Sequence, residues 1–270
     1  GLMDWPVTPD NCRAIAEALD LEIYFSWKTG GFEREMLRDS DPTAPIKYET
    51  PSGIEETGGN GSDGTRRMFP QVSADLSVRW CSAYLKVDVA AAALRGQPRF
   101  RGSRTLFLTG ERAEESAARK NYETFEPHKA DLRDGVRYTR HIDHWRPVHS
   151  WTESEVWSVI EDWGINPHPA YRLGWGRLSC MSCIFGQANQ WASVKEIAPD
   201  RFEKIAQYEE TFETTIHRTM SVRELAKQGT PYDLDPYWVE AALSEEYDEP
   251  AIIDDWEEPQ GAFGESCGPI

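Results

Sequence analysis

The chain has 270 residues, of which 39% are hydrophobic, and a formal net charge of −17. No apolar run approaches the roughly 20 residues that span a bilayer, and no basic, apolar leader opens the sequence. We therefore expect a cytoplasmic protein with reduced thiols. A surface this acidic repels phosphate backbones, which argues against unaided binding of nucleic acid.

The opening of the chain predicts a helix, a strand and a long loop. The helix covers 9–19, with Thr8 as its N-cap, and the strand covers 21–26. Because a parallel α/β unit normally begins with a strand, we expect an N-terminal strand and its loop to be absent from this sequence. Residues 43–79 are rich in Gly and Pro. They include TGGNGSDG at 57–64, which favours a flexible surface loop over a phosphate cradle.

Helix and strand alternate through the middle of the chain. A helix is predicted for about 84–95, a strand for 104–109 and a helix for 113–121. Alternation of this kind favours an α/β fold, in which a mostly parallel sheet is covered by helices.

The second half of the chain is predicted to be mainly helical. Thr152 and Glu155 form a capping box that starts a helix, and Gly164 ends it. The buried stripe of this helix is predicted to include Val159 and Trp163. Further helices are expected at 198–208 and 220–227. The predicted parts of the chain are an α/β domain (1–150), a helical region with a Cys-x-x-Cys pair packed on it (151–230) and an acidic tail (231–270).

A candidate anion site follows the strand at 104–109. Gly110 lets the backbone turn, the N–H groups at the start of the next helix attract an anion, and Arg112 and Ser116 add a cation and a hydroxyl. Ligands of open α/β sheets bind at the carboxyl ends of strands, where this loop lies. An ordinary capped helix with surface ion pairs explains the same pattern equally well.

Cysteines provide a second candidate site. Cys180 and Cys183 are spaced to hold one metal, as zinc or an iron–sulfur cluster, or to form one redox disulfide. Cys81 supplies a third thiol, whose pKa a helix N-terminus and the nearby Lys86 would lower. A further coordination position could be taken by Cys267, by a histidine such as His168 or by an exogenous sulfur. Two ordinary core thiols are the alternative for the Cys-x-x-Cys pair.

Three histidines cluster in RHIDHWRPVHSW. They are His141, His144 and His149. The segment reads as a strand that enters the capped helix, so we favour structural or substrate contacts over metal binding for these side chains.

Four motifs together resemble the phosphoadenosine phosphosulfate (PAPS) reductase family, part of the adenine-nucleotide α-hydrolase-like superfamily and related to PP-loop ATP pyrophosphatases. They are RWCSAYLK, LTGERAEESAAR, HWRPVHSWTESEVW and HPAYRLGWGRLSCMSCIFG, in family order. The resemblance implies a Rossmann-like sheet with helices on both faces, which binds ATP or a PAPS-like adenine nucleotide. The residues that it assigns to the nucleotide are Asp4, Lys86, Gly110, Arg112, Ser116, Arg172 and Arg177.

The cluster-bearing branches of that family bind a 4Fe–4S cluster. The ligands that the resemblance assigns here are Cys81, Cys180 and Cys183. Trp80 stands where those branches carry another Cys, so the cluster would keep an open iron or take Cys267 as its fourth ligand; zinc is the alternative metal. The family's reductases end with a nucleophilic Cys, which Glu-Ser-Cys-Gly at 265–268 resembles loosely. The family's Ser-Gly-Gly-x-Asp-Ser loop has no counterpart, so the nucleotide-binding domain over 1–150 is expected to be N-terminally incomplete.

The function implied by the resemblance is sulfur transfer. ATP would activate an acceptor as its adenylate with release of pyrophosphate, and a sulfur nucleophile would displace AMP. The expected catalytic residues are Lys86, Arg112 and Cys267. Such proteins serve DNA phosphorothioation and tRNA thiolation. The expected partners are a cysteine desulfurase or other sulfur donor, a basic protein that delivers the nucleic acid, and a second copy of the chain in a homo-oligomer. Sulfonucleotide reduction is the alternative chemistry, and a non-catalytic zinc-stabilised module that binds partners is the alternative of another class.

Overall fold

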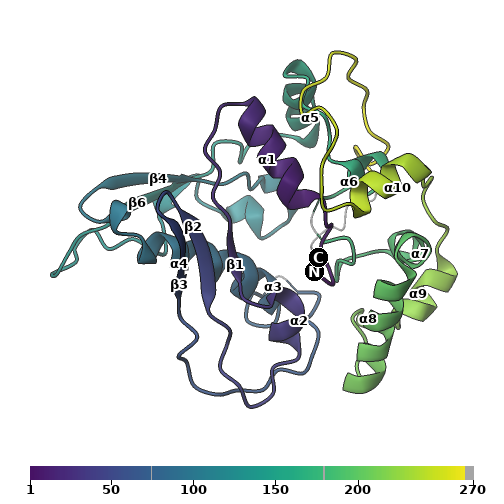
Figure 1. The fold of residues 1–270 in the computed structure, drawn as a ribbon, viewed down its shortest axis with the longest axis horizontal. Helices are drawn as coiled ribbons and strands as arrows, with labels where there is room; N and C mark the ends of the chain where they lie inside the picture. The colour runs from purple at the N-terminus through teal and green to yellow at the C-terminus, as the bar shows by residue number, and fades with distance from the viewer. Residues whose placement is uncertain (74, 179, 265–270) are drawn as a thin grey trace. The chain divides into compact units, whose positions relative to one another are not determined.

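The computed structural model describes residues 1–73, 75–178 and 180–264, and these form two compact units (Figure 1). Unit 1 contains Gly1–Ile23, Met68–Val72 and the described residues from Glu153 to Gly264. Unit 2 contains Tyr24–Arg67 and the chain from Ser73 to Thr152. This division differs from the predicted domains, because the first helix belongs with the second half of the chain. Within the described residues, no helix combines the length and the apolar character that crossing a bilayer requires.

Unit 2 opens with an antiparallel sheet in the order β1-β2-β3. Its strands are β1 (Ser26–Lys28), β2 (Ile46–Thr50) and β3 (Gly53–Thr57). The predicted strand over 21–26 is placed too early, because β1 begins at Ser26, with the Phe25 carbonyl before it accepting from the Glu49 N–H at 2.8 Å. The hairpin of β2 and β3 lies inside the segment that was expected to be a loop. Its turn depends on Gly53, whose φ of 123° is open to glycine and strained for other residues.

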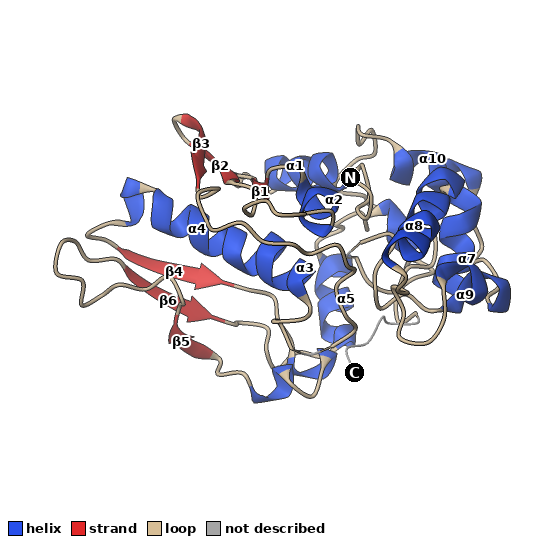
Figure 2. Cartoon of the chain, turned by 90° about the horizontal axis from the view of Figure 1, so that it is seen from below, coloured by secondary structure: helices blue, strands red, loops and turns tan. Residues whose placement is uncertain are grey.

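A long helical segment packs against this sheet and against the second one (Figure 2). It runs through α3 (Trp80–Ser82), a π-helical turn η1 (Ala83–Val87) and α4 (Asp88–Gly96). The helix predicted for about 84–95 is confirmed, and it begins about one turn earlier, at Trp80. Ala91 and Leu94 of α4 pack with Ala130, Ile142 and Phe107 in the core of unit 2. The shorter helices of unit 2 are α2 (Gly31–Met36) and the 3₁₀ turn η2 (Pro98–Phe100).

The second sheet of unit 2 has the order β4-β6-β5. Its strands are β4 (Arg104–Leu108), β5 (Phe125–Pro127) and β6 (His141–Trp145). Strands β4 and β6 are parallel, as expected for an α/β unit, whereas β5 is antiparallel to β6. The fold is thus mixed α/β, and among the described strands one pair is parallel.

The prediction of a helix over 113–121 is wrong. Two 3₁₀ turns replace it, η3 (Ala113–Glu115) and η4 (Arg119–Asn121). Ser116 interrupts them because its backbone is extended, with φ −169° and ψ 156°. The Ser116 hydroxyl instead accepts a hydrogen bond from the Arg119 backbone N–H at 3.1 Å, which starts the second turn.

Unit 1 is built around buried tryptophans, among them Trp5, Trp175 and Trp191. Its helices are α1 (Thr8–Ala18), α5 (Glu153–Asp162), α6 (Pro169–Arg172), α7 (Ala188–Ile197), α8 (Pro199–Phe212), α9 (Val222–Gln228) and α10 (Pro236–Leu243). Helices α1, α5, α8 and α9 were predicted, whereas α7 and α10 were not. Helix α10 lies in the segment that was expected to be only an acidic tail.

Two local predictions for unit 1 are corrected. The N-cap of α1 is Val7, and Thr8 lies within the helix, where its hydroxyl bonds His168 Nε2 at 3.1 Å. In α5 the buried side chain is Trp157, while Val159 and Trp163 are exposed, Trp163 at 64%. Gly164 ends that helix as predicted, with a φ of 58°.

Candidate functional site

The parallel strands β4 and β6 end at the same edge of their sheet, which brings their following loops together. Thr109 N–H donates to the Trp145 carbonyl at 3.1 Å, and Ala113 N–H donates to the His149 carbonyl at 2.8 Å. The loop at 109–112 is thereby held along the segment after β6. In open α/β sheets, ligands bind at this edge.

A closed hydrogen-bond network fixes this edge. Arg146 donates from Nε to Glu111 Oε2 at 2.7 Å and from Nη2 to His144 Nδ1 at 3.2 Å. Because a guanidinium only donates, the His144 proton is on Nε2, which donates to Thr109 Oγ1 at 2.8 Å. The Thr109 hydroxyl then donates to Glu111 Oε2 at 3.1 Å. Arg146 also pairs with Glu126 at 2.8 Å.

Electrostatics at the network keep Glu111 ionised and His144 neutral. Burial raises the pKa of Glu111, but the hydrogen bonds from Arg146 and Thr109 outweigh burial and hold this pKa below its ordinary value. Burial, together with the Arg146 charge, lowers the pKa of His144. The network therefore provides a fixed scaffold for the loop rather than an acid–base pair near neutral pH.

Gly110 and Arg112 lie in the loop that this network holds, and Ser116 follows the 3₁₀ turn η3. The Arg112 guanidinium is mostly buried and donates from Nη1 to Glu114 at 2.8 Å and to the Trp151 carbonyl at 3.5 Å. A Cβ built at Gly110 would meet no atom within 4 Å, so there is open space beside this backbone. The predicted helix N-terminus is missing, because a three-residue 3₁₀ turn follows Arg112. Anion binding here would depend on side chains.

The Cys-x-x-Cys pair lies in unit 1, on a turn with a rigid base. The Met181 carbonyl accepts from Trp175 Nε1 at 3.3 Å and from Gln190 Nε2 at 2.9 Å. Cys183 is buried, and Cys180 is partly exposed. These bonds tie Met181, which lies between the two thiols, to buried side chains of unit 1.

Comparison with known proteins decides the family. The model of the phosphoadenosine phosphosulfate reductase domain matches residues 51–185, half of the chain. This chain belongs to the PAPS reductase family. Members of that family are enzymes that bind adenine nucleotides such as PAPS. The match includes Cys81, Lys86, the 109–116 loop and the Cys-x-x-Cys turn, and it leaves out Asp4.

One curated protein is similar to part of this chain. An uncharacterized 37.8 kDa protein in the gpa 5′ region of Escherichia phage 186 is 29% identical to this chain over 141 residues. The alignment covers 52% of this chain and 39% of the phage protein. No solved structure matches the chain.

The family's metal chemistry is not matched by a complete ligand set in the described part of the chain. There, no three His, Cys, Asp or Glu side chains gather closely enough to hold a metal ion. Cys180 and Cys183 belong to unit 1, Cys81 belongs to unit 2, and Cys267 lies outside the described residues. The three-thiol cluster site and its zinc alternative stay predictions, and we derive no step through a metal.

The other residues that the family resemblance assigned lie in different surroundings. Lys86 is exposed on η1, and Asp4 is exposed in unit 1. The Arg172 guanidinium donates from Nη1 to the Glu257 carbonyl at 3.1 Å and lies over the Trp238 ring at 5.5 Å. Burial lowers the pKa of Arg172. Arg177 lies in the partly exposed loop before the Cys-x-x-Cys pair. Their nucleotide contacts remain predictions.

The histidines have structural partners. His168 is buried, its Nδ1 accepts from the Ala170 N–H at 3.1 Å, and burial lowers its pKa to about 4. Both ring nitrogens of His168 are engaged, which favours its role in shaping the turn over a role as a metal ligand. His141 bonds Asp143 at 3.1 Å, and His149 bonds the Arg119 carbonyl at 2.9 Å.

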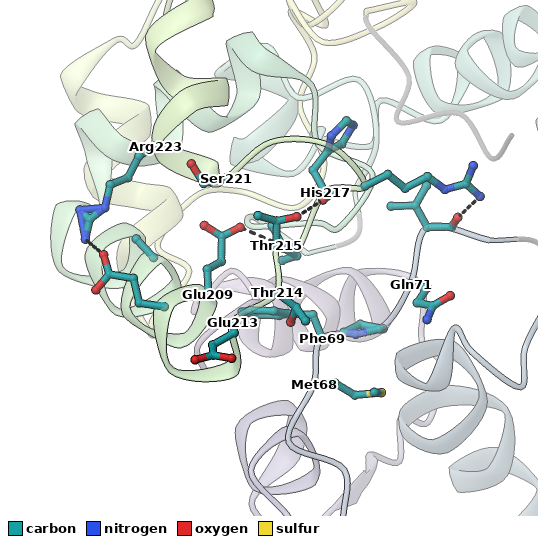
Figure 3. Close-up of a pocket in the computed structure, with 16 residues that line it drawn as sticks. Met68, Phe69, Gln71, Glu209, Glu213, Thr214, Thr215, His217, Ser221 and Arg223 are labelled. Atoms are coloured by element: carbon teal, nitrogen blue, oxygen red, sulfur yellow. Dashed lines mark hydrogen bonds and ion pairs between the residues drawn. The ribbon is translucent and has the colours of Figure 1, made fainter.

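A cavity in unit 1 is lined by none of the predicted site residues. It has a volume of about 700 Å³ and is lined by residues 68–72 and by side chains from α8 to α9 (Figure 3). Glu209 at its wall is buried, which raises the pKa of this carboxyl, and accepts from the Ile216 and Val222 N–H groups at 2.9 and 3.0 Å. Glu209 therefore holds the 213–221 loop in place.

Sequence reasoning missed Glu111, Arg146 and Glu126 as parts of the site. A signal was present, since a charged residue closely follows each of the two parallel strands. This signal cannot be interpreted without the pairing of β4 with β6, which brings together Glu111 and Arg146, 35 positions apart in the sequence.

Proposed function

We propose that this protein is a sulfur-transfer enzyme that uses an adenine nucleotide. The acceptor oxygen attacks the α-phosphorus of ATP and pyrophosphate leaves; a sulfur nucleophile then attacks the activated acceptor and AMP leaves. In this proposal, β4 and β6 belong to a Rossmann-like parallel sheet whose carboxyl edge carries the nucleotide. Cys267 is the proposed terminal nucleophile, with a 4Fe–4S cluster or zinc as the proposed metal group.

The observation that carries this proposal is the loop from Gly110 to Arg112 at the carboxyl edge of the β4–β6 pair. It lies within the family match, it has open space beside Gly110, and the Glu111–Arg146 network holds it. Arg112 would exchange its contact with the exposed Glu114 carboxylate for a phosphate of the nucleotide. Preorganised cations stabilise developing phosphate charge well because they need not reorient during the reaction.

The acceptor is proposed to reach the site through a partner. With a net charge of −17, the protein repels DNA and tRNA, so phosphorothioation or thiolation would require a basic protein that presents the nucleic acid. A cysteine desulfurase or another persulfide donor would supply the sulfur, and the protein would work in the cytoplasm.

Replacement of Arg112 by Ala tests the nucleotide site. Arg104 provides the matched control, because it is exposed and begins β4, at the end of the strand opposite to the loop that carries Arg112. Loss of a charge-assisted contact to phosphate weakens ATP binding by about tenfold or more. Calorimetric titration with ATP should show this loss for Arg112→Ala and not for Arg104→Ala. Equal ATP affinities in the two variants would contradict the assignment.

Sulfonucleotide reduction is the second candidate, since the Cys-x-x-Cys turn could supply a reducing dithiol. The two chemistries differ in their products. ATP with release of pyrophosphate supports sulfur transfer, whereas PAPS with release of sulfite and adenosine 3′,5′-bisphosphate supports reduction. If neither set of products forms and metal analysis finds one zinc per chain, the result supports the non-catalytic module.

A further inference from the structure

A group of buried cations surrounds one carboxylate in unit 2. Glu35 of α2 has no exposed surface, and Arg66 donates to its Oε1 from Nε at 3.1 Å and from Nη2 at 2.9 Å. Arg38 Nε lies 3.5 Å from the same oxygen, and Lys28 Nζ lies 4.0 Å from Oε2. The three cationic side chains expose 11% of their surface or less. We call these four residues the Glu35 cluster.

Charge within the Glu35 cluster is unbalanced. Three cations face one carboxylate, so two positive charges have no matching negative charge inside the cluster. Asp39 on a neighbouring segment pairs with Arg67 at 3.0 Å, and Asp88 pairs with Lys129 at 2.7 Å, while the Asp88 charge also acts on Lys28 and raises its pKa. Buried charges are normally paired, and this excess occurs in a chain whose net charge is −17.

The arginines of the cluster keep unused donors. Among the described residues, the Arg38 guanidinium makes no hydrogen bond, and Arg66 uses two of its three nitrogens on Glu35. A Cβ built at Gly64 would lie 3.5 Å from Arg38 Nη1, in van der Waals contact, so the Gly64 backbone lies beside this guanidinium. The bridge between Gly64 and Asp41 fixes the backbone there.

Aromatic rings hold the cations in place. The Arg66 guanidinium lies 4.7 Å from the ring centroids of both Trp80 and Tyr84, and Lys28 Nζ lies 5.0 Å from the Tyr84 ring. Burial lowers the pKa of Lys28, as do the charges of the two arginines of the cluster, while the carboxylates raise it. A bound anion would relieve this repulsion. The donors are therefore positioned before a ligand arrives, which reduces the entropy lost on binding.

We propose that Lys28, Arg38 and Arg66 form a binding site for a tetrahedral oxoanion with two negative charges, that is, a phosphate or sulfate group. Two unmatched positive charges and unused guanidinium donors fit such a dianion, since arginines bind phosphate and sulfate oxygens through paired N–H groups. The site goes beyond the proposed nucleotide site at Arg112 and stands on different residues, so either can fail without the other.

Calorimetric titration of the protein with inorganic sulfate and with inorganic phosphate, at constant ionic strength set by chloride, tests the site. Arg38→Gln removes a cation that makes no hydrogen bond in the cluster, and Arg67→Gln removes the neighbouring exposed one. We expect both anions to bind the unaltered protein and Arg67→Gln alike, and Arg38→Gln to bind about tenfold more weakly or worse. Absence of sulfate and phosphate binding, or equal affinities in the two variants, would overturn the proposal.

Glu35→Gln provides a test in the opposite direction. Removing the only carboxylate of the cluster raises its excess positive charge, so a dianion should bind more tightly in this variant. Circular dichroism first establishes that each variant is folded. A folded Glu35→Gln protein with weaker sulfate binding would contradict the proposal.

Parallel titrations with ATP and adenosine 3′,5′-bisphosphate identify the source of the anion. If a nucleotide binds more tightly than sulfate and Arg38→Gln abolishes this binding, the site holds a nucleotide phosphate. If only sulfate binds, the site holds a free oxoanion.

Discussion

Side chains far apart in the sequence fix the two charged centres of unit 2, and each centre has its own chemistry. Glu111 and Arg146 form a balanced network at the carboxyl edge of β4 and β6. The cluster around Glu35 instead carries an excess of positive charge. The sequence showed that charged residues follow both parallel strands and that Arg66 ends a Gly-rich segment. It could not show which charges meet, because this depends on strand pairing and on the direction in which each side chain points.

The network at Glu111 predicts a specific dependence of stability on pH. Because the pKa of Glu111 is held below its ordinary value of 4.5, its ionised form stabilises the folded state above that pH. This contribution is lost as the pH falls through the lowered pKa. Glu111→Gln should lower the free energy of unfolding at pH 7 by about 1–3 kcal/mol and reduce its acid dependence, whereas the exposed Glu123→Gln should change neither. Urea unfolding as a function of pH measures both, and identical curves for the two variants would contradict this.

Elements with strong local patterns were predicted well. Helices α1, α5, α8 and α9 and strands β4 and β6 follow from apolar periodicity and from start and stop residues. The hairpin of β2 and β3 was missed because its Pro and Gly residues suggested a loop. The helix over 113–121 failed because Ser116 bonds the next turn and takes an extended backbone. Local competition of this kind is not visible in periodicity.

Because α4 lies close to β2, we predict that Gly96 does not tolerate a larger residue. A Cβ at Gly96 would lie 2.0 Å from the hydroxyl of Tyr48, which is buried and bonds Glu55 at 3.2 Å. Gly96→Ala should therefore lower the free energy of unfolding by about 1–3 kcal/mol, through overpacking. Gly61→Ala, where a Cβ meets no atom, is the control. Because Tyr48→Phe removes the clashing hydroxyl, a double-mutant cycle should show a smaller cost of Gly96→Ala in that background. Additive costs in the cycle would contradict the proposed clash.

At the scale of the molecule, the alternation of helices and strands predicted an α/β fold but not how the chain divides. Unit 1 combines the first helix with the second half of the chain, which no composition shift marks. The acidic segment expected to be a solvated tail contributes to the same unit. Asn166 N–H donates to the Ala251 carbonyl at 2.9 Å, and Ile253 N–H donates to the Gly164 carbonyl at 2.8 Å. Charge alone therefore did not predict whether this segment packs.

Trp256 takes part in that packing and gives a test with a matched control. Its Nε1 donates to the Ile165 carbonyl at 3.0 Å, and its ring lies 6.4 Å from that of Trp157. Trp163, 64% exposed, is the control, because the same substitution there removes little buried surface. Trp256→Ala should lower the free energy of unfolding by about 2–4 kcal/mol, and Trp163→Ala should stay within about 0.5 kcal/mol of the unaltered protein. Hydrogen exchange should lose protection at Ile253 and Asn166 in the first variant, because their backbone bonds join the acidic segment to the end of α5. Unchanged protection in Trp256→Ala would mean that backbone pairing, and not the indole, holds the acidic segment in unit 1.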